Sequence, residues 1–398
     1  MRPREGAEIV SASHNQPKSE LDWGGNLPAI PSKTGVFWPS IAVGIVCALF
    51  GFYLILTPVP RVTNAITTAA TPEPSQTNPS RDPASTQDAR VLRCGFVDSK
   101  DSTFALGMEE FAKGVSQRTN GELVIELLPG GLVDGRKLAE RELVEAVKNR
   151  ELAMALSTTS PLSNFNHDLD IFDLPLLFTG FTHVDTVLDG PVGEKLLNSL
   201  RNHNLQGLGY MEVGFRIFSS SIPLPDYESF HGKKLRVMQS VTLSRFVKAI
   251  GGDPVPAPVN KIYLMGKEGY IDGAGRTYPT YWDFHLYDVH RFISETRHAY
   301  SVKMILINNE LFEDLSPRFQ SALRESAQAA STLQRKKQRE ADQSVKKMAL
   351  KEGIKIFELT DVDRKKFVAA SVELYDEYRK NQSRSILEEV EKAAKSNP

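Results

Sequence analysis

The stretch VLRCGFVDSKDSTFALGMEEFAKGV, from Val91 to Val115, decides the fold class because it joins a strand to a helix. Its first seven residues form a short apolar run typical of a buried strand, and Ser102 is a plausible cap for the amphipathic helix that follows. The runs ELVIELLP (122–129) and LAMALS (152–157) indicate two more strands, and Asp134 is a candidate cap for a helix between them. This alternation predicts an α/β fold with a mostly parallel sheet.

Further along, the chain continues to alternate between helices and strands. We expect a helix at 182–200, a long strand at 205–221 and a shorter strand at 233–238 that is followed by another helix. Ser316 and the proline after it then start a helix that meets no glycine or proline before Gly353. About 36 residues at 1.5 Å each give roughly 54 Å of helix. Because this exceeds the width of one small lobe, the helix is predicted to span two.

The longest apolar run, VFWPSIAVGIVCALFGFYLIL from Val36 to Leu56, contains 21 residues without a charge. A run of this length can cross a bilayer as a helix, so we expect a transmembrane anchor at 35–57 after an N-terminal tail at 1–34. A cleaved signal peptide is the alternative, with small-residue cleavage sites at 63–65 or 68–70. The long segment before the run and the length of the run itself favour a retained anchor.

The segment 58–90 is rich in proline, threonine and serine and poor in large apolar residues, which predicts a disordered tether. A small basic excess before the apolar run favours an N-terminus in the cytoplasm. The residues after the run are then periplasmic, and we expect the protein to be anchored in the inner membrane by its N-terminal helix. Cys47 lies in the apolar run and Cys94 in a predicted strand, so no disulfide framework is indicated.

Composition and motifs exclude several classes of function. The chain has 48 basic and 49 acidic residues without a basic block, so nucleic acid is not an expected partner. The sequence contains no GxSxG, HExxH or CxxC motif, and its histidines lack the spacing of metal ligands. His167 with Asp168 and Asp170 is the nearest approach to an acid–base cluster, but its polar surroundings favour a solvated loop. We therefore predict no catalytic residue, no metal site and no cofactor.

The stretch GYIDGAGRTYPTYW, from Gly269 to Trp282, combines glycines with an arginine and raises the question of a phosphate-binding loop. The third glycine of GxGxxG is missing and neither GKS nor GKT follows, so a nucleotide site is not indicated. The residues 261–270 are predicted to form a helix. We expect Asp272 and Gly273 to end that helix and Gly275 to give the next turn its conformational freedom.

Two arginines interrupt apolar strand patterns and are candidates for binding an anion. Arg236 lies between Leu235 and Val237 in the strand KKLRVM. A guanidinium inside a sheet needs a partner, and its planar fork suits a carboxylate. The alternative is an arginine that faces solvent on an edge strand. Arg216, in GFRIFSS, raises the same question, and there the solvent-facing alternative is favoured.

Five segments in order carry a resemblance to a known family: DIFDLPLLF, GFRIFSSSIPLPDYESFHGKKLRVMQS, VNKIYLMGKEGYIDGAGRTYP, YDVHRFISETRHAYSVKMILINNELFEDLSPRFQSAL and ALKEGIKIFELTDVDRKKF. From Val91 to about Ser383 the chain resembles the extracytoplasmic solute-binding proteins of tripartite ATP-independent periplasmic (TRAP) transporters, the DctP-like family. The resemblance implies an α/β, two-lobed periplasmic-binding-protein-like fold at 91–398, with hinge strands and a long helix that spans both lobes. Lobe 1 is expected mainly at 91–213 and lobe 2 mainly at 214–298, with the C-terminal helices shared.

The resemblance also implies a function. Proteins of the family capture a small carboxylated organic solute in the cleft and close their lobes over it. The closed protein is then read by a small and a large integral membrane subunit, which use an ion gradient, so these subunits are implied partners. A membrane-anchored ligand-sensing domain of a signalling system is an alternative that fits a retained anchor. An enzyme acting on an acidic sugar is a weaker alternative.

The expected site residues follow from the same resemblance. Arg236 matches the arginine of the family's GxKxRV motif, which pairs with the substrate carboxylate, and Arg216 matches a second arginine of the anion site. The family commonly has VDGQENP where this chain has IDGAGRTYP, so Arg276 replaces an asparagine. An added cation there favours a second carboxylate or a more strongly anionic solute. The alternative is that Arg276 turns to solvent or pairs with Asp283.

Three aromatic residues follow Arg276 closely in the sequence. Tyr278, Tyr281 and Trp282 are suited either to stacking on a sugar ring or to packing inside the lobe, and packing is expected for at least two of them. The predicted ligand-binding set is therefore Arg236, Arg216, Arg276, Tyr278 and Trp282.

Overall fold

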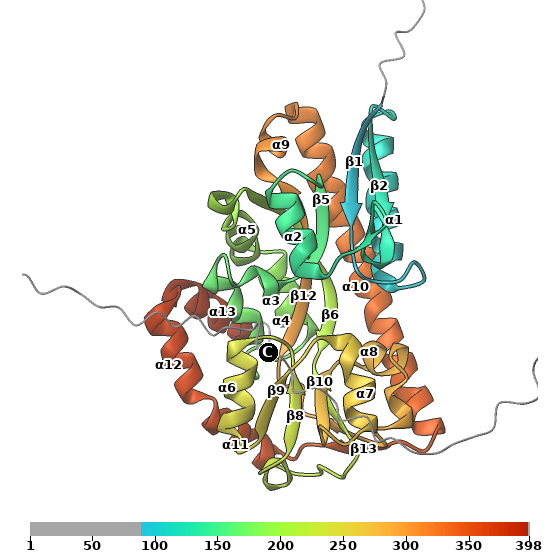
Figure 1. Ribbon diagram of the computed structural model, residues 1–398. Coiled ribbons are helices and arrows are strands. Elements are labelled where there is room, and N and C mark those ends of the chain that lie inside the picture. The colour runs from blue at the N-terminus through green and yellow to red at the C-terminus, as the bar shows by residue number, and fades with distance from the viewer. Residues whose placement is uncertain (1–88, 397–398) are drawn as a thin grey trace, which may run out of the picture. The chain divides into compact units, whose positions relative to one another are not determined.

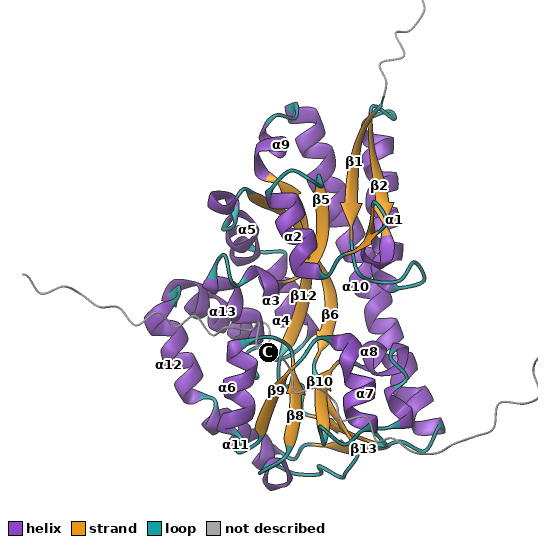
Figure 2. Ribbon diagram, in the orientation of Figure 1, coloured by secondary structure: helices purple, strands orange, loops and turns teal. Residues whose placement is uncertain are grey.

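The computed structural model of the protein describes residues 89–396 (Figure 1). The predicted tail, the anchor at 35–57 and almost all of the tether at 58–90 lie outside the described residues. Within 89–396, no helix is both long and apolar enough to cross a membrane. This part of the chain contains two large mixed β-sheets with helices packed around them (Figure 2).

The first sheet belongs to the first lobe and has five strands in the order β2-β1-β5-β12-β6. The strands are β1 (Arg90–Gly95), β2 (Leu123–Leu128), β5 (Met154–Thr158), β6 (Leu205–Phe215) and β12 (Tyr300–Asn308). The three strands predicted first, β1, β2 and β5, are confirmed and run parallel to one another. The other half of the sheet is antiparallel, because β12 runs against both β5 and β6.

Short helices surround the first sheet. They are α1 (Thr103–Arg118), α2 (Glu140–Lys148), α3 (Thr159–Leu162), the 3-10 helix η2 (His167–Asp173), α4 (Phe181–Leu188), α5 (Pro191–Asn198) and α9 (Asn309–Glu313). Ser102 caps α1 as predicted, since its hydroxyl oxygen accepts a hydrogen bond from the amide of Ala105 at 3.1 Å. The single helix predicted at 182–200 is wrong, because Gly190 and Pro191 divide it into α4 and α5.

The predicted cap at Asp134 is also wrong. Asp134 has a φ of 49° and lies in the turn between two very short strands, β3 (Leu132–Val133) and β4 (Arg136–Lys137). The helix begins only at Glu140, where the Glu142 carboxylate accepts a hydrogen bond from the amide of Ala139 at 2.7 Å. Asp and Asn tolerate a left-handed turn better than most residues, which explains why an aspartate stands in this hairpin.

The second sheet belongs to the second lobe and has six strands in the order β13-β11-β7-β10-β8-β9. The strands are β7 (Ile217–Ser220), β8 (Lys234–Val237), β9 (Asp253–Pro256), β10 (Gly273–Arg276), β11 (Phe292–Glu295) and β13 (Lys355–Glu358). The nearby helices are α6 (Val241–Ala249), α7 (Ile262–Lys267) and α8 (Tyr278–Asp283).

The predicted strand at 205–221 is in fact two strands in different sheets. β6 ends at Phe215 and β7 begins at Ile217, so Arg216 is the residue at which the chain passes from one lobe to the other. The return passage lies alongside: the amide of Arg216 donates to the carbonyl of Ala299 at 2.8 Å, and the amide of His298 donates to the carbonyl of Arg216 at 3.0 Å. These crossing segments, residue 216 and residues 296–299, connect the two sheets and are not themselves strands; their role as a hinge stays a prediction.

The glycine-rich stretch is a strand and not a turn, which corrects the prediction made for it. The helix α7 ends at Lys267, and residues 273–276 form β10, which lies between β7 and β8. Gly275 has no positive φ; a Cβ atom there would lie 3.3 Å from Nε2 of His298 and 3.4 Å from Phe218. Gly275 faces the side of the sheet opposite to the side chains of Ala274 and Arg276. There His298 and Phe218 pack closely and leave little room for a side chain, which explains the glycine.

The long helix α10 (Pro317–Lys351) is confirmed and contacts both lobes (Figure 1). Its 35 residues correspond to about 52 Å of helix at 1.5 Å per residue. It packs against α1 and β6 of the first lobe and against α8 of the second. The C-terminal helices α11 (Asp361–Ala370), α12 (Val372–Asn381) and α13 (Arg384–Ser396) also connect the lobes, because α12 contacts α6 whereas α13 contacts α4 and α5.

One buried side chain ties α10 to β6. Gln334 accepts a hydrogen bond from the amide of Glu212 at 2.7 Å and donates one to its carbonyl at 3.0 Å, and it is fully buried. Replacing Gln334→Ala leaves both backbone groups without these partners, so we expect a loss of about 2 kcal/mol in the free energy of unfolding. Urea unfolding of the purified chain measures this loss, and Gln343→Ala on the exposed side of the same helix is the matched control. Equal effects of the two substitutions would contradict the assignment.

Candidate solute-binding site

Three arginines meet at one edge of the second sheet. Arg236 pairs with Ala274 across the parallel strands β8 and β10, and Arg276 lies two residues beyond Ala274 on β10. Because side chains alternate along a strand, Arg236 and Arg276 lie on the same face of the sheet. Arg276 also pairs with Ile217 of β7, the residue after Arg216. The predicted arginines Arg216, Arg236 and Arg276 are thus brought together, where β8 and β10 end and β7 begins.

All three guanidinium groups are buried. The exposed fraction is 4% for Arg216, 4% for Arg236 and 1% for Arg276. The solvent-facing alternatives for these residues are therefore wrong. Arg236 is not on an edge strand either, because β9 lies between β8 and the edge of the sheet. Burying a charged group away from water is costly unless it is compensated, so three such groups at one place call for an explanation.

Arg236 and Arg216 are held by neutral groups. Nε and Nη2 of Arg236 both donate to the carbonyl of Ala257, at 2.7 and 2.5 Å. Nη2 of Arg216 donates to the carbonyl of Gly275 at 2.6 Å, and Nη1 donates to Oγ of Ser301 at 3.4 Å. These contacts fix the orientation of each guanidinium, but carbonyl and hydroxyl oxygens do not cancel its charge. Burial lowers the pKa of Arg236, and the charges of Arg216 and Arg276 lower it further.

Arg276 differs from the other two. Among the described residues, none of its three guanidinium nitrogens has a hydrogen-bond partner. The predicted alternative of an ion pair with Asp283 is wrong, because Asp283 lies on the exposed side of α8 and makes no ion pair with Arg276. Burial lowers the pKa of Arg276 to about 9, and the charge of Arg216 contributes to this shift.

One buried carboxyl group of the first lobe lies near Arg216. Asp173 is the last residue of η2, is 3% exposed and accepts a hydrogen bond from Oγ of Ser160 at 3.3 Å. Burial raises its pKa to about 6, and a hydrogen bond from Ser240 of the second lobe together with the charge of Arg216 limits the rise. Sequence reasoning missed Asp173, although an aspartate inside the apolar run DIFDLPLLF was a usable signal.

Two histidines near the arginines are neutral. His298 is stacked between Phe218 and Phe246, and burial and the charge of Arg216 lower its pKa well below the usual value. His290 bonds to Oγ of Ser219 at 2.9 Å, and burial lowers its pKa to about 3. Neither histidine therefore adds charge to the site at neutral pH.

The predicted aromatic residues make their contacts elsewhere. The hydroxyl of Tyr278 donates to Glu295 at 2.7 Å, and the ring of Trp282 packs against Tyr287 at 4.6 Å between centroids. Tyr281 is fully buried and donates to the carbonyl of His290 at 2.8 Å. These contacts support packing for all three aromatic residues, Tyr281 included. Contact of Tyr278 and Trp282 with a solute stays a prediction.

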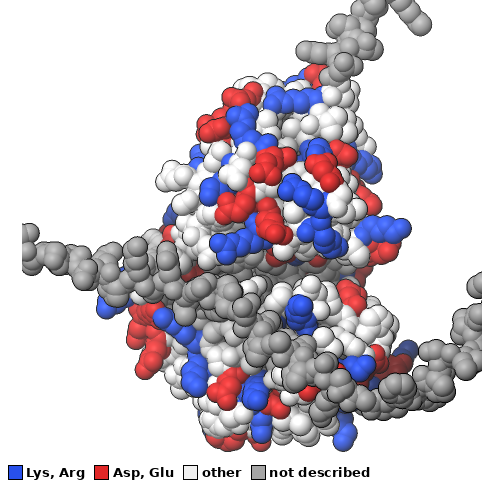
Figure 3. All heavy atoms as spheres, viewed as in Figure 1, with Lys and Arg blue, Asp and Glu red and all other residues white. Residues whose placement is uncertain are grey.

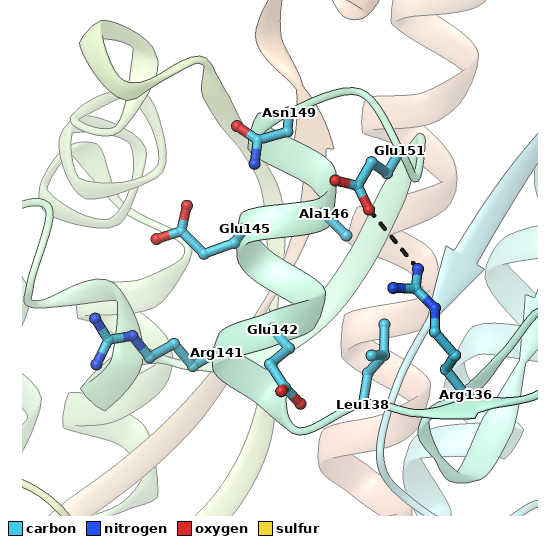
Figure 4. A pocket seen from close by; sticks show the side chains of 8 residues that line it. All are labelled: Arg136, Leu138, Arg141, Glu142, Glu145, Ala146, Asn149 and Glu151. Carbon is cyan, nitrogen blue, oxygen red and sulfur yellow. Dashed lines mark ion pairs between the residues drawn. The ribbon is translucent and has the colours of Figure 1, made fainter. Parts of the chain in front are cut away.

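A hollow on the surface of the first lobe differs from this buried group of arginines. A hollow of about 280 Å³ beside α2 is lined by Arg136, Leu138, Arg141, Glu142, Glu145, Ala146, Asn149 and Glu151 (Figure 4). Its charges are mixed, and Arg136 and Glu151 pair with each other at 3.8 Å. On the face in Figure 3 positive and negative side chains are likewise intermixed. Positive charge is concentrated instead in the interior, where the three buried arginines lie at the junction of the lobes.

Comparison with known proteins identifies this architecture. The family model for bacterial extracellular solute-binding proteins of family 7, named DctP, matches residues 95–381. The chain belongs to this family. It is 30% identical over 280 residues to the 2,3-diketo-L-gulonate-binding periplasmic protein YiaO of Escherichia coli, covering 70% of this chain and 84% of that protein. It is accordingly a TRAP-type solute-binding protein, of an extracytoplasmic family, and not an enzyme.

Solved structures agree with the family. The sugar acid binding protein DctPAm of Advenella mimigardefordensis, in complex with galactonate, has a TM-score of 0.71 and 25% sequence identity, covering 77% of this chain and 98% of its own. A TRAP periplasmic solute-binding protein of Xanthobacter autotrophicus with bound β-D-galacturonate has a TM-score of 0.70 and 26% identity, covering 75% of this chain and 99% of its own. The two-lobed fold predicted from the sequence is confirmed.

The raised pKa of Asp173 makes a prediction about stability. Because the folded state favours the protonated form, this stabilisation is fully present below the ordinary aspartate pKa and is lost as the pH rises through about 6. Relative to Asp173→Asn, the free energy of unfolding of the unchanged protein should fall by up to about 3 kcal/mol between pH 4 and pH 6.5. Urea unfolding across that range measures the difference. A difference that is constant, or that rises with pH, would show that burial does not govern this carboxyl group.

Proposed function

We propose that the protein captures a small carboxylated solute of the sugar-acid class outside the cytoplasm and presents it to the integral membrane subunits of a TRAP transporter. The observation that carries this proposal is the group of three buried arginines accompanied by one buried aspartate. A carboxylate is the anion that a guanidinium fork binds best, through two parallel hydrogen bonds. The relatives described above, whose named ligands are sugar acids, support the same class.

In this proposal Arg236 and Arg216 hold the solute carboxylate. Each already donates to a backbone carbonyl, so its orientation is set before the solute arrives. A preoriented guanidinium loses little conformational freedom on binding, which favours affinity. The charge of each remains uncancelled by its carbonyl partner, and a carboxylate between the two supplies the missing negative charge.

The residues of the proposed site come from both lobes, which supports binding by lobe closure. The arginines belong to the second lobe and the crossing segments, whereas Asp173 and Ser160 come from the first lobe. Ser240, the N-cap of α6, lowers the pKa of Asp173, so groups of the two lobes lie close together at the site. Closure around the crossing segments brings these groups together and holds the site away from water, consistent with the burial of the three arginines and of Asp173, and this strengthens each charged contact.

The role of Arg236 is tested by substitution. Loss of a charged pair costs about 1.5 to 3 kcal/mol, so we expect Arg236→Ala to weaken sugar-acid binding by roughly 10- to 150-fold or to abolish it. Arg236→Lys keeps the charge but not the fork and is expected to weaken binding as well. Calorimetry with galactonate and galacturonate measures both effects, and Arg245→Ala on the exposed side of α6 is the control. Unchanged affinity in both Arg236 variants would refute the carboxylate assignment.

A thermal-shift screen tests the solute class. A solute that binds only the folded chain adds about 2.7 kcal/mol of stability at a hundred times its dissociation constant. We expect galactonate, galacturonate or a related sugar acid to raise the Tm, and neutral galactose to leave it unchanged. The acid should be recovered chemically intact from the complex. A Tm that rises equally with the acid and the neutral sugar would argue against an anion site.

A further inference from the structure

The unpaired guanidinium of Arg276 is not explained by binding one carboxylate. Arg276 is among the largest fully buried side chains, and its Nε, Nη1 and Nη2 all lack partners within residues 89–396. Arg236 and Arg216, by contrast, each use nitrogens on carbonyl or hydroxyl oxygens. An arginine that is nine-tenths buried with no acceptor is rare, because every unsatisfied donor costs free energy.

The position of Arg276 places it beside the other two arginines and not in a separate region. It shares a sheet face with Arg236 of β8, in a diagonal relation that corresponds to a Cα separation of roughly 7 to 8 Å. Nη2 of Arg216 is bonded to the carbonyl of Gly275, the residue before Arg276. The charges of the three guanidinium groups therefore act on one another.

The charges around Arg276 do not balance within the protein. Facing it are Arg236 from β8, Arg216 from the crossing segment, neutral His290 and the neutral phenol of Tyr281 from α8. The buried carboxyl of Asp173 acts on Arg216.

The carboxylate of Glu295 on β11 does not supply the missing charge. Its oxygens are taken by the hydroxyl of Tyr278 and by Lys346, each at 2.7 Å. With Asp173 ionised, three positive charges therefore face one negative charge, which leaves an excess of two.

We propose that Arg276 binds a second anionic group of the solute, so that the preferred solute is a diacid of the sugar-acid class with a carboxylate at each end. One carboxylate lies between Arg236 and Arg216, and the other meets the free fork of Arg276. The two negative charges of such a solute cancel the excess of two. This inference rests on the proposed function, since it assigns a second contact within the same site.

Three pairs of linear acids test the inference, because the members of each pair have the same number of carbons and differ in bearing either one or two terminal carboxylates. The pairs are galactonate and galactarate, gluconate and glucarate, and threonate and tartrate. We expect calorimetry to show that at least one diacid binds tenfold or more tightly than its monoacid. If every monoacid that binds does so as tightly as its diacid, the second contact is refuted while the proposed function stands. If none of the acids binds, the proposed function fails, and the inference fails with it.

Substitution tests whether Arg276 causes the tighter binding of a diacid than of a monoacid. We expect Arg276→Asn to weaken diacid binding by at least tenfold and to change monoacid binding by less than about threefold, with Arg276→Lys intermediate. Arg291→Asn, on the exposed side of the second lobe, removes the same charge at a distance and should leave the ratio of the two affinities unchanged. An equal loss for monoacid and diacid in Arg276→Asn would overturn the inference.

A stability measurement separates this role from a structural one. Arg276→Met retains much of the side-chain length but removes an uncompensated buried charge, so without solute its Tm should equal or exceed that of the unchanged protein. The same variant should lose the preference for the diacid. A lower Tm for Arg276→Met would show that the guanidinium supports the fold, and would overturn the inference.

Discussion

The concentration of buried positive charge where the lobes meet is the constraint on which the rest of this structure depends. Two like charges about 7 Å apart repel by roughly 2 kcal/mol at an effective dielectric constant of about 20, and three pairs contribute in this site. The fold tolerates this repulsion because β7, β8 and β10 belong to one sheet whose register fixes all three backbones. In the proposed function, a solute that neutralises these charges relieves the repulsion among the arginines when it binds. The free energy of that repulsion then adds to the affinity.

Arg216 connects the site to the movement of the lobes. Its backbone bonds to Ala299 and His298 on the neighbouring crossing segment, while its guanidinium bonds to Gly275 of β10. A change in the angle between the lobes must turn the backbone of residue 216 and therefore shift its side chain. α10 limits the range of such movement, because it packs on both lobes and is fixed to β6 by Gln334. In the proposed function, binding and closure are therefore coupled through this one residue.

The sequence predicts those parts of the fold that have a local signal. The strands β1, β2 and β5 and the helix α10 follow from apolar periodicity, Ser102 and the Ser316-Pro317 start. The strand β10 was missed because GAGR contains no β-branched or aromatic residue, and the sheet on both sides of it imposes the extended conformation. The break at Arg216 was missed for a related reason: apolar alternation continues through 205–221 while the strand changes sheets.

The candidate site was likewise predictable from the sequence only in part. Arg236 and Arg216 were recognisable because the sequence itself shows a charged residue inside an apolar run. That they lie next to Arg276 depends on the order of the strands in the sheet, which the sequence does not show. Asp173 lies on the other lobe, so no local pattern relates it to the arginines. A neutral amide in place of Arg276 would be satisfied by hydroxyl groups, whereas a buried guanidinium requires a negative charge. In the proposed role, Arg276 therefore selects against solutes that lack a second negative charge.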